Sequence, residues 1–134
     1  MSAKAVFSPN APTPPPFLSQ AISIGNLVFC SGQVAVDTKT GTLVSGTVGD
    51  RTKQILLNLS AVLDAADSSL ENIIKANIYL TNIQDFAEVN DVYVSFFPGL
   101  KPARTCVGVR ELPLGTDVEI ECIASKRTLV SGHL

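Results

Sequence analysis

Apolar and polar residues change their spacing several times along the chain, and each change marks a new structural element. Two runs rich in apolar and β-branched residues, 21–24 and 27–33, predict strands. Gly25-Asn26 lies between them, and both residue types tolerate a positive φ, so a two-residue hairpin turn is expected. From about Gly49 the apolar residues recur at helical spacing, and Asp67-Ser68-Ser69 ends that predicted helix.

The second half of the chain repeats this succession. Residues 73–80 predict a strand, and a second helix begins near Asp85 and stops at Pro98-Gly99. Two further strands are expected at about 103–109 and 118–124. The order ββ-α-β-α-ββ predicts an α+β fold, with a mixed sheet and two helices packed on one face.

Two helices cannot cover both faces of such a sheet. Residues 27–30 are apolar in succession, and Ile73-Ile74 begin another strand in the same way. Charged residues make up only 16% of the chain, which also favours surface buried between subunits. A homo-oligomer is therefore expected.

The 134 residues suit a single domain, 1–134, with a proline-rich N-terminal segment at 1–16 and a C-terminal tail at 126–134. A net charge of −2 provides no overall basic field that would attract nucleic acid. The single histidine, His133, disfavours a zinc site and a Ser/His or Cys/His catalytic pair.

Cysteine usage and the chain ends bear on the expected compartment. The three cysteines form no Cys-x-x-Cys pair, which predicts unpaired thiols in a reducing compartment. No apolar run reaches membrane-spanning length, and no signal peptide is apparent, so a cytoplasmic protein without a membrane partner is expected. The last residues, Ser131-Gly132-His133-Leu134, faintly echo a peroxisomal address, so peroxisomal and mitochondrial locations stay open.

The last two predicted strands carry the chemistry. Arg104, Cys106 and Gly108 share one face of their strand, and Glu119 and Glu121 share a face of the next. An arginine on a mostly apolar strand is costly to bury unless an anion meets it. One interpretation is a structural Arg–Glu pair between adjacent antiparallel strands. The other is a guanidinium that binds a substrate carboxylate, with a nearby glutamate that activates water.

Three weaker features have two interpretations each. Ser31-Gly32 at a strand end permits close approach of a ligand, or is a simple β-bulge. Asn90 beside the apolar stripe of the second helix is a surface or capping residue, or part of a site. The pKa of Cys106 is lowered by the neighbouring cation, or the thiol packs as a small apolar group.

Taken together, these pieces resemble the Rid (reactive intermediate deaminase, or YjgF) family from about residue 18 to 125. The similar segments are Ser19-Gln20-Ala21, Ser31-Gly32-Gln33, Asp85 to Asn90 with Tyr93 and Phe96-Phe97, Lys101 to Val107, Leu112-Pro113 and Val118 to Glu121. Each segment is short, but their order and spacing are specific.

The resemblance implies a chorismate-mutase-like fold that assembles as a homotrimer with sites in the clefts between subunits. The implied activity is that of a 2-iminobutanoate/2-iminopropanoate deaminase. Such an enzyme hydrolyses reactive 2-imino acids and 2-aminoacrylate-type enamines to 2-keto acids and ammonia, with no cofactor and no metal.

The resemblance also implies residue roles. Arg104 would bind the substrate carboxylate and Glu119 would orient the attacking water. The backbone at Cys106 and the Ser31-Gly32 segment would line the pocket, and Asn90 would support it. Leu18 departs from the family pattern, because a tyrosine that touches the ligand often stands at this position.

Two other functions stay open. A non-catalytic trimer that binds small carboxylates such as 2-keto acids would use the same arginine. An endoribonuclease or translation inhibitor is disfavoured by the acidic balance and by the lack of an RNA-binding motif.

Overall fold

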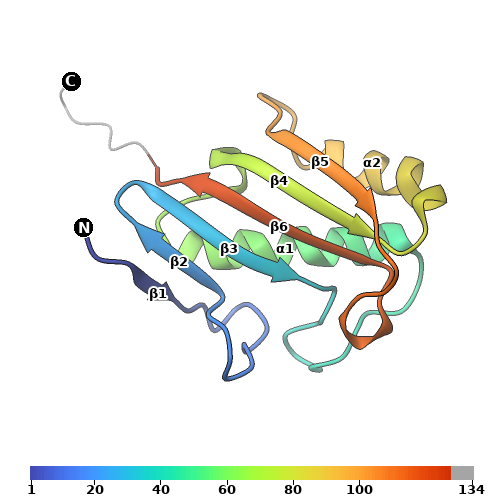
Figure 1. The fold of residues 1–134 in the computed structure, drawn as a ribbon, viewed down its shortest axis with the longest axis horizontal. Helices are drawn as coiled ribbons and strands as arrows, with labels where there is room; N and C mark the ends of the chain where they lie inside the picture. Colours follow the sequence, from blue (N-terminus) through green and yellow to red (C-terminus); the bar gives the residue numbers. More distant parts are fainter. Residues whose placement is uncertain (128–134) are drawn as a thin grey trace.

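The protein is built as two layers, a mixed sheet and a pair of helices behind it (Figure 1). The structure is a computed structural model that describes residues 1–127. The sheet has the strand order β1-β2-β3-β6-β4-β5, in which β4 and β5 are parallel and all other neighbours are antiparallel. The strands are β1 Lys4–Val6, β2 Ala21–Ile24, β3 Leu27–Gln33, β4 Ile73–Leu80, β5 Ala103–Gly108 and β6 Val118–Ser125.

Both helices, α1 Val48–Ala65 and α2 Phe86–Ser95, cover the same face of the sheet (Figure 1). Strand β6 shows that only one face of the sheet is buried, because its residues alternate between buried and partly exposed along its whole length. Ile120 and Cys122 face α1 and are almost completely buried, as are Ile55 and Leu59 of the helix. The α+β fold predicted from the apolar spacing is therefore confirmed.

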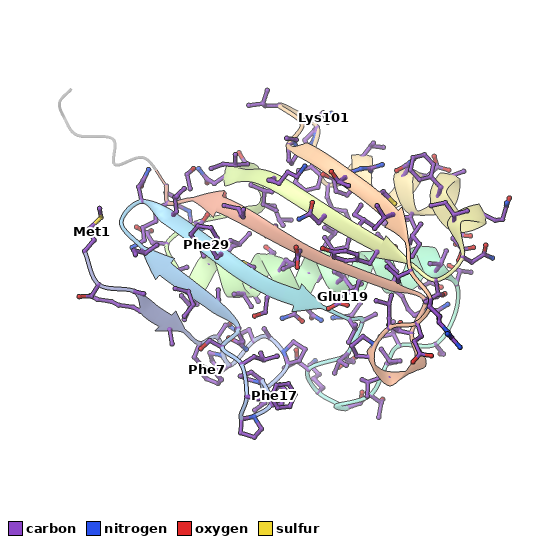
Figure 2. All side chains as sticks on the ribbon, viewed as in Figure 1. Met1, Phe7, Phe17, Phe29, Lys101 and Glu119 are labelled. Atoms are coloured by element: carbon purple, nitrogen blue, oxygen red, sulfur yellow. The ribbon has the colours of Figure 1, made fainter. Side chains whose placement is uncertain are left out.

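The opposite face of the sheet has no covering layer within residues 1–127. Leu27, Phe29 and Val107 lie on it and are about two-fifths exposed. Figure 2 shows Phe29 and Glu119 on this open face, turned away from the helices. An apolar sheet face left in this state is typical of a surface between subunits. The homotrimer itself stays a prediction.

The β2–β3 turn and the bounds of both helices lie close to the positions expected from the sequence. The short strand β1 was not predicted. The β2–β3 turn is Gly25-Asn26, and only Gly25 uses a positive φ, of 56°. Three-residue β1 pairs with β2 at the edge and is too short for its side-chain spacing to show. Cys30, Cys106 and Cys122 form no disulfide.

Of the predicted C-terminal tail, residues 128–134 lie outside the described residues, and so do His133 and the peroxisome-like ending. Within residues 1–127, neither helix combines the length and the apolar character needed to span a membrane.

Candidate functional site

Arg104 points to the helix side of the sheet. It pairs with Ala76 on β4, and Ala76 pairs with Cys122 on β6. Residues directly opposite each other share a face, and both of these partners are buried beneath the helices. The half-buried guanidinium lies against α2, with its central carbon 4.8 Å from the ring centroid of Tyr93 and 5.6 Å from that of Phe86. The two rings hold the cation by cation–π contact.

No carboxylate pairs with Arg104 among residues 1–127. The ion pairs there join Arg51 to Asp117, and Arg127 to Asp64 and Asp67. The structural Arg–Glu pair considered from the sequence is therefore wrong, because β4 lies between β5 and β6. The guanidinium fork is left for another anion.

Two polar groups on the face of α2 that meets this guanidinium have no hydrogen-bond partners in the described chain. Phe86, Asn90 and Tyr93 follow at helical spacing and share one face of α2. Asn90 Oδ1 and the Tyr93 hydroxyl are buried, and neither has a partner within the described chain. Buried polar groups are usually paired, so these two atoms are suited to a ligand or a second subunit. Sequence reasoning missed Phe86 and Tyr93 as neighbours of Arg104, although their spacing with Asn90 could have indicated it.

Cys106 lies on the same covered face as Arg104, two residues further along β5. Burial raises the pKa of its thiol, and the opposing effect of Arg104 is smaller. The interpretation in which the cation lowers this pKa is therefore corrected, and Cys106 is a packed thiol.

Glu119 lies on the open face, opposite Tyr79 of β4. Burial raises the pKa of its carboxyl, and the neighbouring charge of Glu121 raises it further. Glu121 is occupied, because one of its oxygens accepts hydrogen bonds from Asn77 Nδ2 and the Tyr79 hydroxyl, both at 3.0 Å. No described residue donates a hydrogen bond to Glu119. Of the two glutamates, Glu119 is therefore the one available to act on water or a ligand.

Gly32 lies directly beneath the Glu119 carboxylate. A methyl group at position 32 would overlap Glu119 Oε2 and lie 2.9 Å from Cδ. The pairing of β3 with β6 shifts register between Cys30 and Gln33, so the β-bulge interpretation of Ser31-Gly32 is confirmed. The Ser31 hydroxyl donates to the Ser19 carbonyl at 2.6 Å and holds the bulge against the segment before β2.

A pocket of about 520 Å³ opens around Glu119, Ser31 and Gly32. Its lining also includes Phe17 and Leu18, and Pro113-Leu114. Leu18, the position that departs from the family pattern, therefore lies at the same pocket as Glu119.

The six predicted site residues form two clusters in one copy of the chain. Arg104, Cys106 and Asn90 form an arginine cluster on the helix side. Ser31, Gly32 and Glu119 form a glutamate cluster on the open side. The sheet separates the two clusters, so one copy cannot bring Arg104 and Glu119 to the same small molecule.

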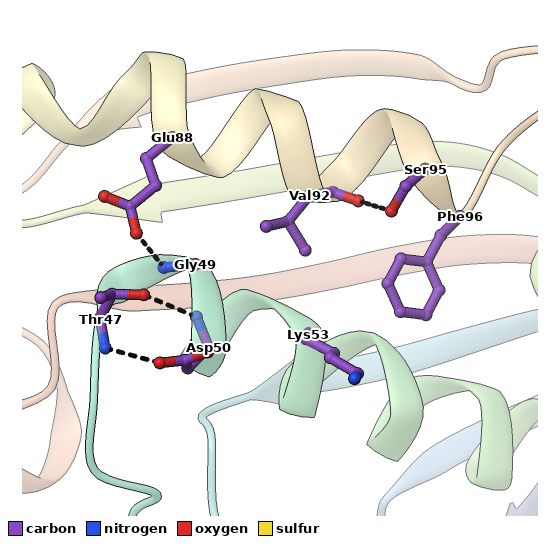
Figure 3. Close-up of a pocket in the computed structure, with 8 residues that line it drawn as sticks. All are labelled: Thr47, Gly49, Asp50, Lys53, Glu88, Val92, Ser95 and Phe96. Atoms are coloured by element: carbon purple, nitrogen blue, oxygen red, sulfur yellow. Dashed lines mark hydrogen bonds between the residues drawn. The ribbon is translucent and has the colours of Figure 1, made fainter.

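A second pocket, between α1 and α2, holds none of these residues (Figure 3). Several of its polar groups cap the start of α1. Glu88 Oε2 accepts from the Gly49 amide at 2.9 Å, and Thr47 and Asp50 form a capping box at the start of α1. This pocket is explained by helix capping. Within residues 1–127, no group of three or more His, Cys, Asp and Glu side chains is arranged to hold a metal ion.

Comparison with known proteins places this chain in a large group of relatives. The family described as "Endoribonuclease L-PSP" matches residues 8–126. A RutC family protein of Pyrococcus horikoshii is 46% identical over 123 residues, which cover 92% of this chain and 98% of that protein. The 2-iminobutanoate/2-iminopropanoate deaminase of Dermatophagoides farinae is 41% identical over 124 residues, which cover 92% and 97%.

Solved structures of related proteins share the fold as well. The crystal structure of E. coli TdcF with bound serine superposes with a TM-score of 0.88 at 35% identity, covering 92% of this chain and 99% of that one. Other relatives are named as a mitochondrial protein of Schizosaccharomyces pombe and a chloroplastic protein of Arabidopsis thaliana, so the group is found in more than one compartment. The sequence resemblance, the matched segment and the shared fold lead to one conclusion: the chain belongs to the Rid (YjgF) family, the family described as endoribonuclease L-PSP.

Proposed function

We propose that the protein hydrolyses reactive 2-imino acids to 2-keto acids and ammonia, in sites shared between neighbouring copies of the chain. One observation carries the proposal. A guanidinium without a carboxylate partner and a carboxylate without a hydrogen-bond donor lie on opposite faces of the sheet. A second copy packed on the open face would bring one copy's Arg104 to the other copy's Glu119. A relative with this activity in its name supports the reaction class.

Each residue has a role in this reaction that follows from its chemistry. Arg104 binds the substrate carboxylate with two parallel hydrogen bonds. Glu119 accepts a proton from water while the water oxygen adds to the imine carbon. Glu119 then gives this proton to the nitrogen of the carbinolamine, which forms from the protonated imine. The C–N bond breaks to release ammonia, the hydroxyl proton passes through Glu119 to the departing ammonia, and the C=O of the keto acid forms. The raised pKa of Glu119 brings its basicity closer to what this proton transfer needs.

The other predicted site residues shape the cleft. Gly32 permits the Glu119 carboxylate to lie against the backbone, and Ser31 fixes the bulge that carries it. The backbone at Cys106 and the unpaired Asn90 Oδ1 would contact the substrate from the arginine cluster. An imine carbon is already electrophilic, so positioning of this kind supplies most of what the reaction requires.

The test is to generate 2-aminoacrylate in situ with a dehydratase and follow decay of the imine. The protein is expected to accelerate the decay, and Arg104→Ala and Glu119→Ala to abolish the acceleration. Arg110→Ala, which removes an exposed arginine just beyond the same strand, is the matched control and should behave as the parent. Equal decay with the parent and with Arg104→Ala would overturn the mechanism.

A second function, binding of small carboxylates without catalysis, is favoured by the related structure that holds serine. It needs Arg104 but no water-activating base. Calorimetric titration with 2-ketobutyrate separates the two functions. A parent that binds without accelerating imine decay, with undiminished binding in Glu119→Ala, would establish the binder.

A further inference from the structure

Leu114 adopts a conformation that its side chain disfavours. Its φ is 60° and its ψ is 14°, within the left-handed region that glycine and asparagine adopt more readily. Its side chain is also 69% exposed. A strained backbone and an exposed leucine are two independent costs at one residue, and such costs persist at functional sites.

This leucine lines the Glu119 pocket. Pro113, Phe17 and Leu18 line the same pocket, and the side chains of Leu18 and Phe17 are 41% and 83% exposed. Exposed apolar side chains therefore line the pocket that also holds the Glu119 carboxylate, although polar side chains are the more usual ones on an exposed surface.

The wall that carries Leu18 and Phe17 is held in place from behind. Gln20 is 1% exposed, and its side chain accepts from the Ser8 amide at 2.6 Å. The same side chain donates to the carbonyls of Ser8 and Pro12, at 3.1 and 2.9 Å. Because these bonds fasten the proline-rich segment to the start of β2, the wall is formed before any ligand arrives.

We propose that Leu114, Leu18 and Phe17 receive the side chain of the substrate and select 2-imino acids with branched aliphatic or aromatic side chains. This inference rests on the proposed function. The substrate carboxylate is taken by Arg104 of a second copy, and the imine carbon lies beside Glu119. The third substituent then points to the apolar walls, where burial of its carbons against Leu114 and Leu18 favours the larger side chain.

The inference is tested with Leu114→Asn and Leu114→Gly. Both new residues tolerate a positive φ, so the turn is kept while the apolar contact is removed. Imines are generated from alanine, leucine and phenylalanine with an amino-acid oxidase, and kcat/KM is measured for each. The parent is expected to prefer the leucine- and phenylalanine-derived imines. In both variants the ratio of kcat/KM for the leucine imine to that for the alanine imine falls about tenfold.

Leu100→Asn is the matched control, because Leu100 is 94% exposed and lies outside the pocket. It should leave the ratio unchanged. The inference is overturned if the parent has its highest kcat/KM for the alanine imine. It is also overturned if a Leu114 variant lowers kcat/KM for all three imines by the same factor. Either result leaves the proposed function standing.

If the parent accelerates hydrolysis of none of the imines, the proposed function fails. The inference is then tested by the binding of 2-keto acids. Pyruvate and 4-methyl-2-oxopentanoate are titrated by calorimetry into the parent and Leu114→Asn. Tighter binding of the branched acid that is lost in the variant supports the apolar walls, and equal binding of the two acids overturns them.

Discussion

The Glu119 carboxylate occupies the space that a side chain at position 32 would fill, so its position depends on Gly32 having no Cβ. Gly32→Ala places a methyl group where Glu119 Oε2 now lies. The carboxylate ends a flexible side chain, so it is expected to move aside while the fold persists. Imine hydrolysis should fall about a hundredfold, since a displacement of about 1 Å can have an effect of that size.

The control for this prediction is Gly99→Ala, because an added methyl group there meets no atom within 4 Å. Kinetics and thermal unfolding are measured on both variants. An active Gly32→Ala protein would show that the position of Glu119 is not important for the reaction. A protein with a markedly lower Tm would show that Gly32 supports the fold instead.

Much of the site at residue scale was open to prediction. A period of two residues assigns Arg104 and Cys106 to one strand face, and Glu119 and Glu121 to one face of another. The pattern could not say that Tyr79 and Asn77 occupy Glu121 and leave Glu119 unpaired. The left-handed Leu114 was equally hidden, because its backbone conformation opposes its own preference.

At the scale of elements, α1 depends on a carboxylate from α2. Glu88 caps the Gly49 amide, which has no partner within its own helix (Figure 3). Glu88→Ala is expected to lower the free energy of unfolding by about 1 kcal/mol, and Glu88→Gln by less, because the amide oxygen still accepts. Denaturant unfolding at one fixed subunit concentration measures this. Asp91→Ala on the same helix is the control, and an equal loss in both variants would exclude the cap.

The start of α1 is also joined to the start of β6 through a bidentate ion pair. Arg51 Nε and Nη2 donate to the two oxygens of Asp117 at 2.7 and 2.8 Å. Hydrogen bonding to Arg51 holds the pKa of Asp117 below its ordinary value. Asp117→Asn should therefore cost about 2 kcal/mol of unfolding free energy at neutral pH.

This stabilisation has a defined pH dependence. The pKa of Asp117 is lower in the folded protein, so the stabilisation is complete above the unfolded value of about 3.9. It is lost as the pH falls through the folded value, so parent and Asp117→Asn should converge below about pH 4. Asp64→Asn, which breaks an exposed pair with Arg127, should change little at any pH. A constant difference between parent and Asp117→Asn across this range would contradict the assignment.

The elements themselves could be predicted where each buries an apolar stripe, as α1 and β6 do. β1 could not, since Lys4–Val6 is held only by its pairing with β2. The strand order could not be predicted from the sequence either, and it determines which charged residues can pair. Placing β4 between β5 and β6 separates Arg104 from both glutamates.

At the scale of the whole molecule, two incomplete clusters and one uncovered sheet face require the same explanation. Phe29 and Leu27 expose apolar surface on the same sheet face as the glutamate cluster, and the arginine cluster lies on the helix side of the edge strand β5. A second copy that covers the open face would complete both. The low charged content indicated a partner. The register of the strands places Arg104 and Glu119 on opposite faces of one copy, which supports the proposal that the two halves of the site come from different copies.

Mixed assemblies of two inactive variants test this arrangement directly. Arg104→Ala lacks the carboxylate-binding half, and Glu119→Ala lacks the water-activating half. In a ring where each site takes Arg104 from one copy and Glu119 from the next, random mixing at equal amounts restores both residues in about a quarter of the sites. The two proteins are therefore unfolded together and refolded, and imine hydrolysis should return to about a quarter of the parent rate.

Each variant refolded alone, with its circular dichroism checked against the parent, should stay inactive. If both residues acted within one copy, every site would keep one defect and the mixture would stay inactive too. Recovered activity thus requires a site that no single copy contains.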